Sequence, residues 1–516
     1  MEMNRKRNIT GTTGKRSTIT RRTFMRASAG AAIGFAAAPY LNCGKEEVVT
    51  PLKRQFARLR FEVTTLGLGG EGSLRWTPAD VDPVVIILKA FGLGVNYFDT
   101  SNLSGPSQSN YGKAFRALDL IPGQPGYNEP LRRSIFLTGK THLRFAKGGW
   151  EHKNIVNATD GPQGSHAIDD LKRTLSIVFG DGEGNYPSGA YLDMFLVHNV
   201  RSMEEIDALY EGLFEPDPRA DHIGALAALV DFRDGSNLTG LNTREERLIR
   251  HIGFSLHESP AVGIEMVQRD IENTFDGMLV TINPNDRLYF NMQHNVIPIA
   301  SGKNMGVIGM KVFANGGIYL ADASRTDSPE TVVRTIGSRT LPSRPLVQYA
   351  LTTPGIDTVI TGVGYIDNDG EQCQLVQNLS AAQISADGFT DNNRRYVERF
   401  INAVKGGNTN YYQAAAIPLS PPREPVVAQT ARDTQRIVRL TWQTAYAGTE
   451  PIRGYEIRCD GRRIGRVLHA PQTTRRQPFV YEDTPTDRSA HIYRIVTIDA
   501  ARRTAPSEEL TVESLV

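Results

Sequence analysis

A carboxylate, an amine and an imidazole each stand at the end of a short apolar run of this sequence. They are Asp99 after Asn96-Tyr97-Phe98, Lys140 after Phe136-Leu137-Thr138-Gly139, and His198 after Met194-Phe195-Leu196-Val197. If these runs are neighbouring parallel strands, their carboxyl ends lie at one edge of the sheet, so the three side chains converge where such folds carry acid–base chemistry. An ion pair with a capping histidine at a barrel rim would leave the same pattern, and that alternative stays open here.

Apolar runs of strand length alternate with helical patterns along most of the chain. The candidate strands are Val63–Leu68, Val95–Asp99, Ile135–Thr138, Leu192–Val197, His251–Ser255, Gly277–Thr281, Gly306–Lys311 and Thr358–Thr361. The candidate helices include Ala79–Phe91, His166–Val178, Ala225–Phe232, Pro260–Gln268, Pro345–Leu351 and a final one at Asn392–Val404. Continuous apolar runs are typical of parallel strands covered on both faces. Eight strand–helix units within residues 55–405 therefore predict a (β/α)₈ barrel of the TIM type. An open doubly wound sheet is the alternative.

The pattern changes after the last predicted helix. Residues 406–422 are rich in Gly, Asn and Pro, a composition typical of a linker. Residues 423–516 contain short runs of period-two alternation separated by turn signals, which predict a small all-β sandwich. The placement of Trp442, Tyr455 and Tyr493 resembles a fibronectin type III module, with these rings in its core.

Further motifs follow one another in the order found in the aldo-keto reductase family. They are Phe98-Asp99-Thr100, Ser107-Gln108 with Gly112-Lys113-Ala114, Ile252-Gly253-Phe254-Ser255, Asn283-Pro284, Gly306–Lys311, and Pro354-Gly355 with Val359-Ile360-Thr361-Gly362. Together they make the chain from about Leu59 to Val404 resemble that family, and His257 and Met310-Lys311 resemble its bacterial branch with twin-arginine signals. The resemblance implies an NADP(H)-dependent oxidoreductase that interconverts a carbonyl and an alcohol on a small, carbonyl-bearing or sugar-like substrate.

The resemblance also implies roles for the residues at the strand ends. Asp99 would fix Lys140, Lys140 would lower the pKa of a proton donor, and His198 would orient the carbonyl. The family's donor is a Tyr five positions after the Asp, where this chain has Ser104. Tyr111 lies nearby but aligns with a packing position, and His142, two residues beyond Lys140, is a further candidate for moving a proton.

The cofactor positions match the family in part. Ser255, Lys311, Gly362 and Asn378 are the contacts that the resemblance assigns to NADP(H). Two positions that usually carry amide side chains against the carboxamide hold other residues, Leu256 and Leu279. These losses favour a second hypothesis, a catalytically impaired barrel that acts as a ligand-binding or envelope-associated protein.

The first residues predict export. Thr20-Arg21-Arg22-Thr23-Phe24 precedes the Ala-rich run Ala27–Ala38, a layout that resembles a twin-arginine signal in residues 1–43. We therefore expect export machinery to bind Arg21 and Arg22 and the protein to be periplasmic, with Cys43 as a candidate for lipidation. The C-terminal module, with its many arginines, is a candidate for contact with the envelope.

Composition excludes several other classes of protein. Apolar residues make up 40% and charged residues 22% of the 516 residues, as in ordinary globular proteins. A formal charge of +2 leaves no basic excess for neutralising nucleic-acid phosphates. The 3 cysteines include no Cys-x-x-Cys pair, so we expect neither a disulfide framework nor a metal site.

Overall fold

The computed structural model describes residues 49–289, 291–319, 327–337, 342–405, 417–432 and 435–515. The predicted export signal, with Arg21, Arg22 and Cys43, lies outside the described residues, as does most of the predicted linker. No helix among the described residues has the length and apolar character needed to cross a membrane.

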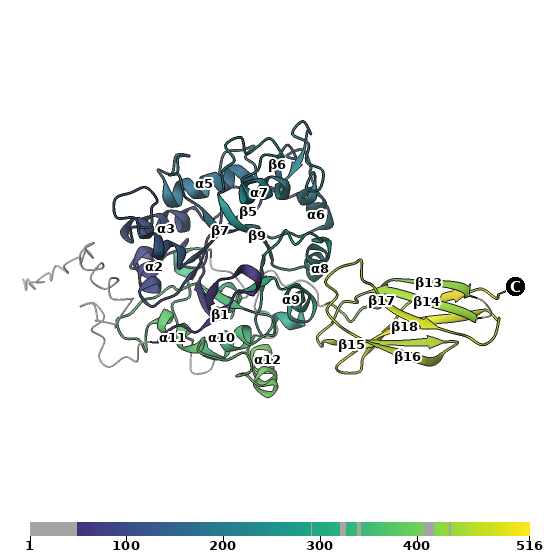
Figure 1. The fold of residues 1–516 in the computed structure, drawn as a ribbon. Helices are drawn as coiled ribbons and strands as arrows, with labels where there is room; N and C mark the ends of the chain where they lie inside the picture. Colours follow the sequence, from purple (N-terminus) through teal and green to yellow (C-terminus); the bar gives the residue numbers. More distant parts are fainter. Residues whose placement is uncertain are drawn as a thin grey trace, which may run out of the picture. The chain divides into compact units, whose positions relative to one another are not determined.

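Eight parallel strands close into a barrel, which confirms the predicted fold class (Figure 1). In barrel order the strands are β3 (Leu66–Leu68), β4 (Tyr97–Asp99), β5 (Phe136–Thr141), β7 (Leu192–Val197), β9 (Ile249–Leu256), β10 (Gly277–Thr281), β11 (Gly306–Met310) and β12 (Thr358–Thr361). Three of them have the predicted bounds. The register pairs Asp99 with Thr138 and Lys140 with Leu196, so the ends of β4, β5 and β7 lie side by side.

The predicted first strand is divided in two by the structure. Its first part, β2 (Glu62–Thr64), pairs with β1 (Lys53–Gln55) in an antiparallel hairpin, and only β3 joins the barrel. The connection between β1 and β2 places Phe56 and Leu59 in the barrel core, where they pack with residues such as Tyr97, Met194 and Ile308. The split buries this apolar connection, a gain that strand pattern alone does not reveal.

Helices follow most of the strands and cover the outside of the barrel (Figure 1). They are α2 (Pro83–Gly92), α3 (Gly105–Ala117), α4 (Glu129–Arg133), α5 (Ala167–Phe179), α6 (Met203–Tyr210), α7 (Ala225–Asp234), α8 (Pro260–Arg269), α9 (Met292–Gly302), α10 (Arg344–Leu351), α11 (Gln374–Ala381) and α12 (Asp391–Lys405). Several begin as the sequence dictates: Asp82, Ser202 and Ser259 accept hydrogen bonds from backbone N–H groups in the first turns of α2, α6 and α8.

A small sheet forms outside the barrel from two insertions that the sequence patterns did not reveal. Strand β6 (Phe145–Lys147) follows β5, and β8 (Ile223–Gly224) precedes α7; the two pair in antiparallel register. The pairing joins the segment between β5 and α5 to the segment between α6 and α7.

The C-terminal region consists of antiparallel sheets. One sheet has the order β13 (Arg423–Arg432), β14 (Gln435–Gln443), β17 (Phe479–Asp483). The other contains β16 (Arg462–Leu468), β15 (Ile452–Cys459), β18 (His491–Asp499) and β19 (Thr504–Pro506), with β20 (Leu510–Val512) also paired to β18. Trp442, Tyr455 and Tyr493 share one hydrophobic core, as expected. The likeness to fibronectin type III and the domain bounds 55–405, 406–422 and 423–516 stay predictions.

Candidate active site

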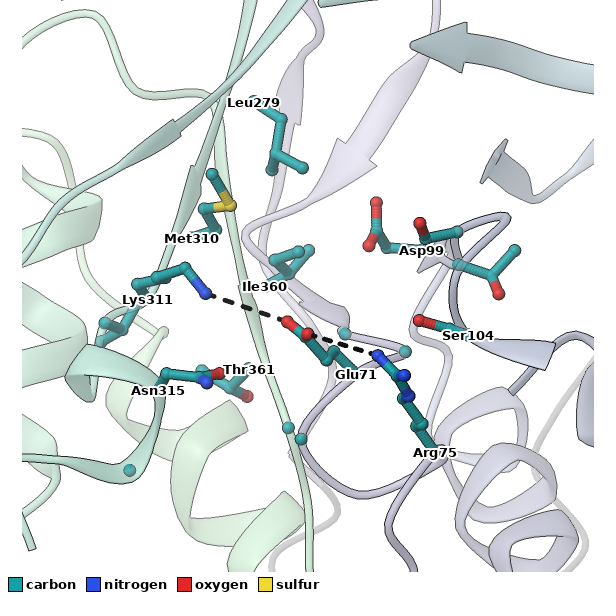
Figure 2. Close-up of a pocket in the computed structure, with 18 of the residues that line it drawn as sticks. Glu71, Arg75, Asp99, Ser104, Leu279, Met310, Lys311, Asn315, Ile360 and Thr361 are labelled. Atoms are coloured by element: carbon teal, nitrogen blue, oxygen red, sulfur yellow. Dashed lines mark ion pairs between the residues drawn. The ribbon is translucent and has the colours of Figure 1, made fainter. Parts of the chain in front are cut away.

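A cavity of about 290 Å³ lies at the carboxyl ends of the barrel strands (Figure 2). The predicted residues Asp99, Lys140, His198, Ser104, Lys311 and Gly362 all line it. They come from β4 and β5 and from the segments after β4, β7, β11 and β12, so barrel closure brings together positions between Asp99 and Gly362. Backbone from the loop after β3, including Gly70 and Gly72, completes one wall.

Asp99 and Lys140 form a buried ion pair at the ends of β4 and β5. The Lys140 ammonium donates to Asp99 Oδ1, and also to the backbone carbonyl of Thr100 at 2.6 Å. Their side chains are only 7% and 4% exposed. Burial raises the pKa of Asp99, while the charge and hydrogen bond of Lys140 lower it. The pair holds a cation at the cavity wall, where it can stabilise a developing negative charge.

Three imidazoles gather beside this pair. The rings of His142 and His198 lie 4.1 Å apart between centroids, and His257 Nε2 is 3.3 Å from His198 Nε2. The other nitrogen of His198, Nδ1, is 3.3 Å from the Ser101 hydroxyl. Burial lowers the pKa of all three, to about 3 for His142, and neighbouring cationic groups lower them further. The imidazoles are therefore neutral at pH 7, so one of the paired Nε2 atoms donates to the other.

A buried arginine fixes the backbone beneath these imidazoles. The Arg144 guanidinium donates to the carbonyls of His142, His198 and Asn199 at 2.9 to 3.0 Å. Its charge is balanced by Glu205, whose carboxylate accepts at 2.9 Å. Neither residue was predicted, because a charged side chain after a strand or in the first turn of a helix carries no local sign that it will be buried.

The donor position is occupied by a hydroxyl side chain, as predicted. Ser104 lies just before α3, is almost fully buried, and its side chain makes no capping hydrogen bond to the helix. Tyr111 is a packing residue: its ring contacts Phe98 and Phe115, and its hydroxyl donates to the Leu68 carbonyl at 3.4 Å. Among the described residues, no tyrosine lines the cavity.

Charged residues also line the other side of the cavity (Figure 2). Lys311 Nζ lies 3.8 Å from Glu71 Oε2, and Arg75 Nη1 lies 3.9 Å from Glu71 Oε1. Lys311 has a left-handed backbone with φ of 57°, and its carbonyl accepts from the Asn283 amide at 3.3 Å. The end of β11 therefore turns at Lys311, and the side chain is almost fully buried against the cavity.

Two predicted cofactor contacts do not reach the cavity. Ser255 Oγ accepts a hydrogen bond from the backbone N–H of Asn199 at 2.9 Å. The Asn378 amide donates to Thr361 Oγ1 at 3.4 Å from its place in α11. Neither residue lines the cavity, because both side chains bond to neighbouring loops and strands instead. Their contact with a cofactor stays a prediction without support from the arrangement of the cavity.

Asn199 is a cavity residue that the sequence analysis missed. It follows His198 with a left-handed φ of 52°, and its side chain lines the cavity. Its Oδ1 is buried and has no hydrogen-bond partner among the described residues. A buried acceptor without a partner is costly, so this atom is suited to accept from a bound molecule once the side chain turns toward the cavity. In the sequence, an Asn directly after a strand end is only a weak signal of a left-handed turn at the cavity.

The barrel is similar to solved structures of aldo-keto reductases. A Pseudomonas aeruginosa protein assigned to that family is 17% identical, with 69% of this chain and 100% of that chain covered and a TM-score of 0.39. Klebsiella pneumoniae aldo-keto reductase crystallised with NADPH is 15% identical over 68% of this chain and 95% of its own, with a TM-score of 0.40. A Klebsiella pneumoniae aldo/keto reductase crystallised with NADP and acetate is 16% identical over 68% of this chain and 95% of its own, with a TM-score of 0.39. No protein-family profile and no curated protein matches the chain.

Proposed function

We propose that the barrel is an NADP(H)-dependent oxidoreductase that interconverts a carbonyl and an alcohol on a small substrate. One observation carries the proposal: the Asp99–Lys140 ion pair, His198 and Ser104 converge in a single cavity at the carboxyl ends of the strands. Closed barrels of this kind place their chemistry at that end.

Residues of the cavity fit a nicotinamide nucleotide. Asn199 Oδ1 offers an acceptor to a carboxamide N–H beside His198. The Lys311 ammonium supplies a cation for a phosphate or hydroxyl oxygen on the opposite side. Gly72 leaves open space, since a Cβ there would meet no atom within 4 Å. The cofactor, when bound, supplies or accepts the hydride.

The side chains would perform the remaining chemistry. Burial holds the pKa of His198 low, so its ring is neutral and carries one N–H. To orient a carbonyl oxygen, that N–H would have to be on Nε2 and turn from His257 Nε2 to the substrate. The Lys140 ammonium would stabilise the negative charge that grows on that oxygen. Ser104 would hold the proton to be delivered, directly or through a water molecule. A serine hydroxyl is a far weaker acid than a phenol, so we propose slow turnover.

A binding protein without catalysis is the second candidate. No tyrosine among the described residues lines the cavity, and the Glu71 carboxylate lies beside Lys311 where a phosphate would compete with it. In this case the ion pairs and imidazoles would recognise a polar ligand without transforming it.

We also propose that the protein is exported to the periplasm by the twin-arginine route, with Cys43 as a lipidation candidate. That route carries folded proteins, so a cytoplasmic nucleotide could be bound before export. The C-terminal module would contact the envelope, for which exposed Arg462, Arg463 and Arg466 offer cations to an acidic partner.

Titration of the purified chain with NADPH, followed by assay on a panel of aldehydes, tests the oxidoreductase. We expect saturable binding and aldehyde-dependent loss of NADPH absorbance. Lys140→Met should lower turnover by about 100-fold or more, because it removes the cation beside the reacting oxygen. Lys303→Met is the matched control: Lys303 is also a largely buried lysine near an aspartate, with Nζ 3.7 Å from Asp270 Oδ2, but it does not line the cavity. Absence of NADPH binding in the wild-type chain would reject the oxidoreductase and favour the binding protein.

A further inference from the structure

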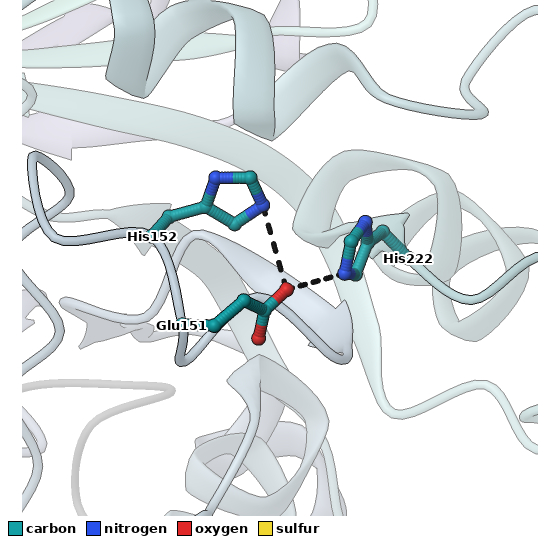
Figure 3. Close-up of side chains that lie close together, drawn as sticks. All are labelled: Glu151, His152 and His222. Carbon is teal, nitrogen blue, oxygen red and sulfur yellow. Dashed lines mark ion pairs between the residues drawn. The ribbon is translucent and has the colours of Figure 1, made fainter.

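We propose that Glu151, His152 and His222 bind a divalent cation of the zinc class outside the barrel. The three residues lie on the insertions that the small sheet joins, and Figure 3 shows them together. None of them lines the barrel cavity. Two imidazoles and a carboxylate are a ligand set that Zn²⁺ prefers, with a further coordination position left for water or another ligand. The proposal departs from the expectation, drawn from the cysteines, that the chain has no metal site.

Backbone pairing brings the ligands together. Strands β6 and β8 align Lys147 with Ile223, so the residues just after β6 meet the residue just before β8. The Lys147 ammonium donates to the carbonyls of Ala220 at 2.6 Å and Pro218 at 3.3 Å, which fastens the two segments further. The turn at Gly149 has a φ of 85°, and a Cβ there would overlap the Phe145 ring. The approach of His152 to His222 is therefore set by the fold rather than by the two side chains alone.

The donor atoms point toward one another. Glu151 Oε1 lies 3.5 Å from His152 Nε2 and forms a closer ion-pair contact with His222 Nε2 (Figure 3). One ligand atom from each of the three residues lies within 4.8 Å of the other two. In a tetrahedral zinc site, bonds of about 2.1 Å place ligand atoms about 3.4 Å apart. Small rotations of these side chains would reach that geometry.

Neighbouring groups support the imidazoles as they do in metal sites. His222 Nδ1, the nitrogen away from Glu151, lies 3.9 Å from Glu211 Oε1. A carboxylate hydrogen-bonded behind a ligating histidine fixes its tautomer and raises its basicity, and a small rotation of Glu211, which now lies beyond hydrogen-bond distance, would supply that support. The His152 ring stacks on Phe145 with centroids 5.3 Å apart and planes 15° from parallel. His152 and Glu211 also line a cavity of about 790 Å³, which gives solutes access to this side of the cluster.

A second cluster, formed by Cys459, Asp460 and His491, is a poorer site. Both nitrogens of His491 are already bonded to carboxylates, Nδ1 to Asp460 at 2.8 Å and Nε2 to Asp487 at 3.0 Å. A metal on Nδ1 would replace the Asp460 contact, as a metal at the proposed site would replace the contact of His222 with Glu151, so the clusters differ chiefly in that this one offers a single imidazole. His491 is therefore the matched control for the proposed site.

Titration of the metal-free, tag-free chain with Zn²⁺ by calorimetry tests the proposal. We expect one equivalent to bind with micromolar or tighter affinity, and Co²⁺ to give the visible absorption of a four-coordinate ion. His152→Ala and His222→Ala should each weaken binding by at least 10-fold, while His491→Ala and the cavity variant His257→Ala should leave it unchanged. Millimolar or weaker binding, or a loss of binding confined to either control variant, would overturn the proposal.

Glu211→Gln tests the site with a variant in which misfolding is less of a concern than in the alanine variants. It keeps all three ligands and the size of the side chain, and should weaken Zn²⁺ binding about 10-fold because the support of His222 is lost. Thermal melts of every variant without metal establish that the fold is kept. If Glu211→Gln and both ligand variants melt like the wild-type chain and still bind Zn²⁺ with its affinity, the site is wrong.

Discussion

At the scale of single residues, the rate of the proposed reaction depends on how acidic the proton donor beside Lys140 is. The cation is in place, held by Asp99 and the Thr100 carbonyl, but the nearest predicted donor is the Ser104 hydroxyl. A lysine can lower the pKa of a neighbouring phenol and make it a useful acid, whereas the pKa of a serine hydroxyl stays far above neutral pH. The oxidoreductase hypothesis therefore makes a prediction about gain of function.

Ser104→Tyr should raise the turnover of simple aldehydes with NADPH. General acid catalysis contributes about 10² to 10⁴ in rate, so an increase of at least 10-fold is expected. Steady-state assays that follow NADPH absorbance measure it.

Lys140→Met supplies the control for that gain. The double variant should gain much less, because no cation would then lower the pKa of the new phenol. An equal gain in both backgrounds would show that Lys140 does not tune the donor. NADPH binding without any gain from Ser104→Tyr would point to His142 or a water molecule as the donor.

The buried imidazoles make a second residue-scale prediction, on stability. Burial lowers the pKa of His142 from 6.5 to about 3, so between these values the unfolded chain binds a proton that the folded chain does not. The free energy of unfolding should therefore fall as the pH drops below about 6.5, by up to about 1.4 kcal/mol per pH unit for this group.

His142→Gln should make the free energy of unfolding less dependent on pH. Urea unfolding at about pH 7 and about pH 5 measures the difference for both proteins. His198 and His257, whose pKa values burial also lowers, should keep part of the dependence in the variant. A variant with the same dependence as the wild-type chain would contradict the buried, neutral state of His142.

At the scale of elements, the loop after β3 must lie close to the end of β4. A Cβ on Gly70 would meet the Asp99 carbonyl oxygen at 2.2 Å and the Ser107 hydroxyl at 2.6 Å. Gly72, two residues further along the same loop, has open space around it. The contact at Gly70 is what positions this loop against the strand that carries the ion pair.

Gly70→Ala should destabilise the protein by about 1 to 3 kcal/mol, since the added methyl group forces the loop and β4 apart. Gly72→Ala, the matched control, should change the free energy of unfolding by no more than about 0.5 kcal/mol. Urea unfolding of both variants measures the contrast. Equal effects would mean that the loop does not pack on β4 as the structure has it.

At the scale of the whole molecule, polar contacts join helices of the barrel to the C-terminal sheets. Asn295 on α9 donates to the Ala447 carbonyl at 3.1 Å and accepts from its N–H at 2.8 Å. Arg287 lies 2.9 Å from the Glu450 carboxylate, and Gln268 donates to the Gln472 carbonyl at 2.7 Å. The predicted linker is therefore accompanied by direct polar contacts between the two regions.

Export is the whole-molecule prediction. Replacing both Arg21 and Arg22 with Lys should leave the protein in the cytoplasm, because the twin-arginine machinery would no longer recognise the chain. Immunoblots of cytoplasmic and periplasmic fractions measure it. Replacing Arg5 and Lys6 instead keeps the pair and serves as the control. Periplasmic protein from the Arg21, Arg22 variant would remove the argument for this route.

The sequence by itself determined the barrel and much of its cavity. Continuous apolar runs report strands buried on both faces, and a polar residue directly after such a run, like Asp99, Lys140 or His198, has to lie at the rim. Local pattern is enough here because the closed barrel fixes where every strand ends.

The tertiary structure alone decided the features that depend on contacts between distant segments. The neutral imidazole cluster, the Arg144–Glu205 pair beneath it, Asn199 Oδ1 without a partner among the described residues, and the Glu151–His152–His222 cluster lie on loops or insertions, except that Glu205 stands on α6. Ser255 and Asn378 matched the expected positions, yet the structure bonds both side chains to neighbouring segments instead. The physical reason is that loop side chains take their partners from whichever segments the fold brings near, and periodicity does not record those partners.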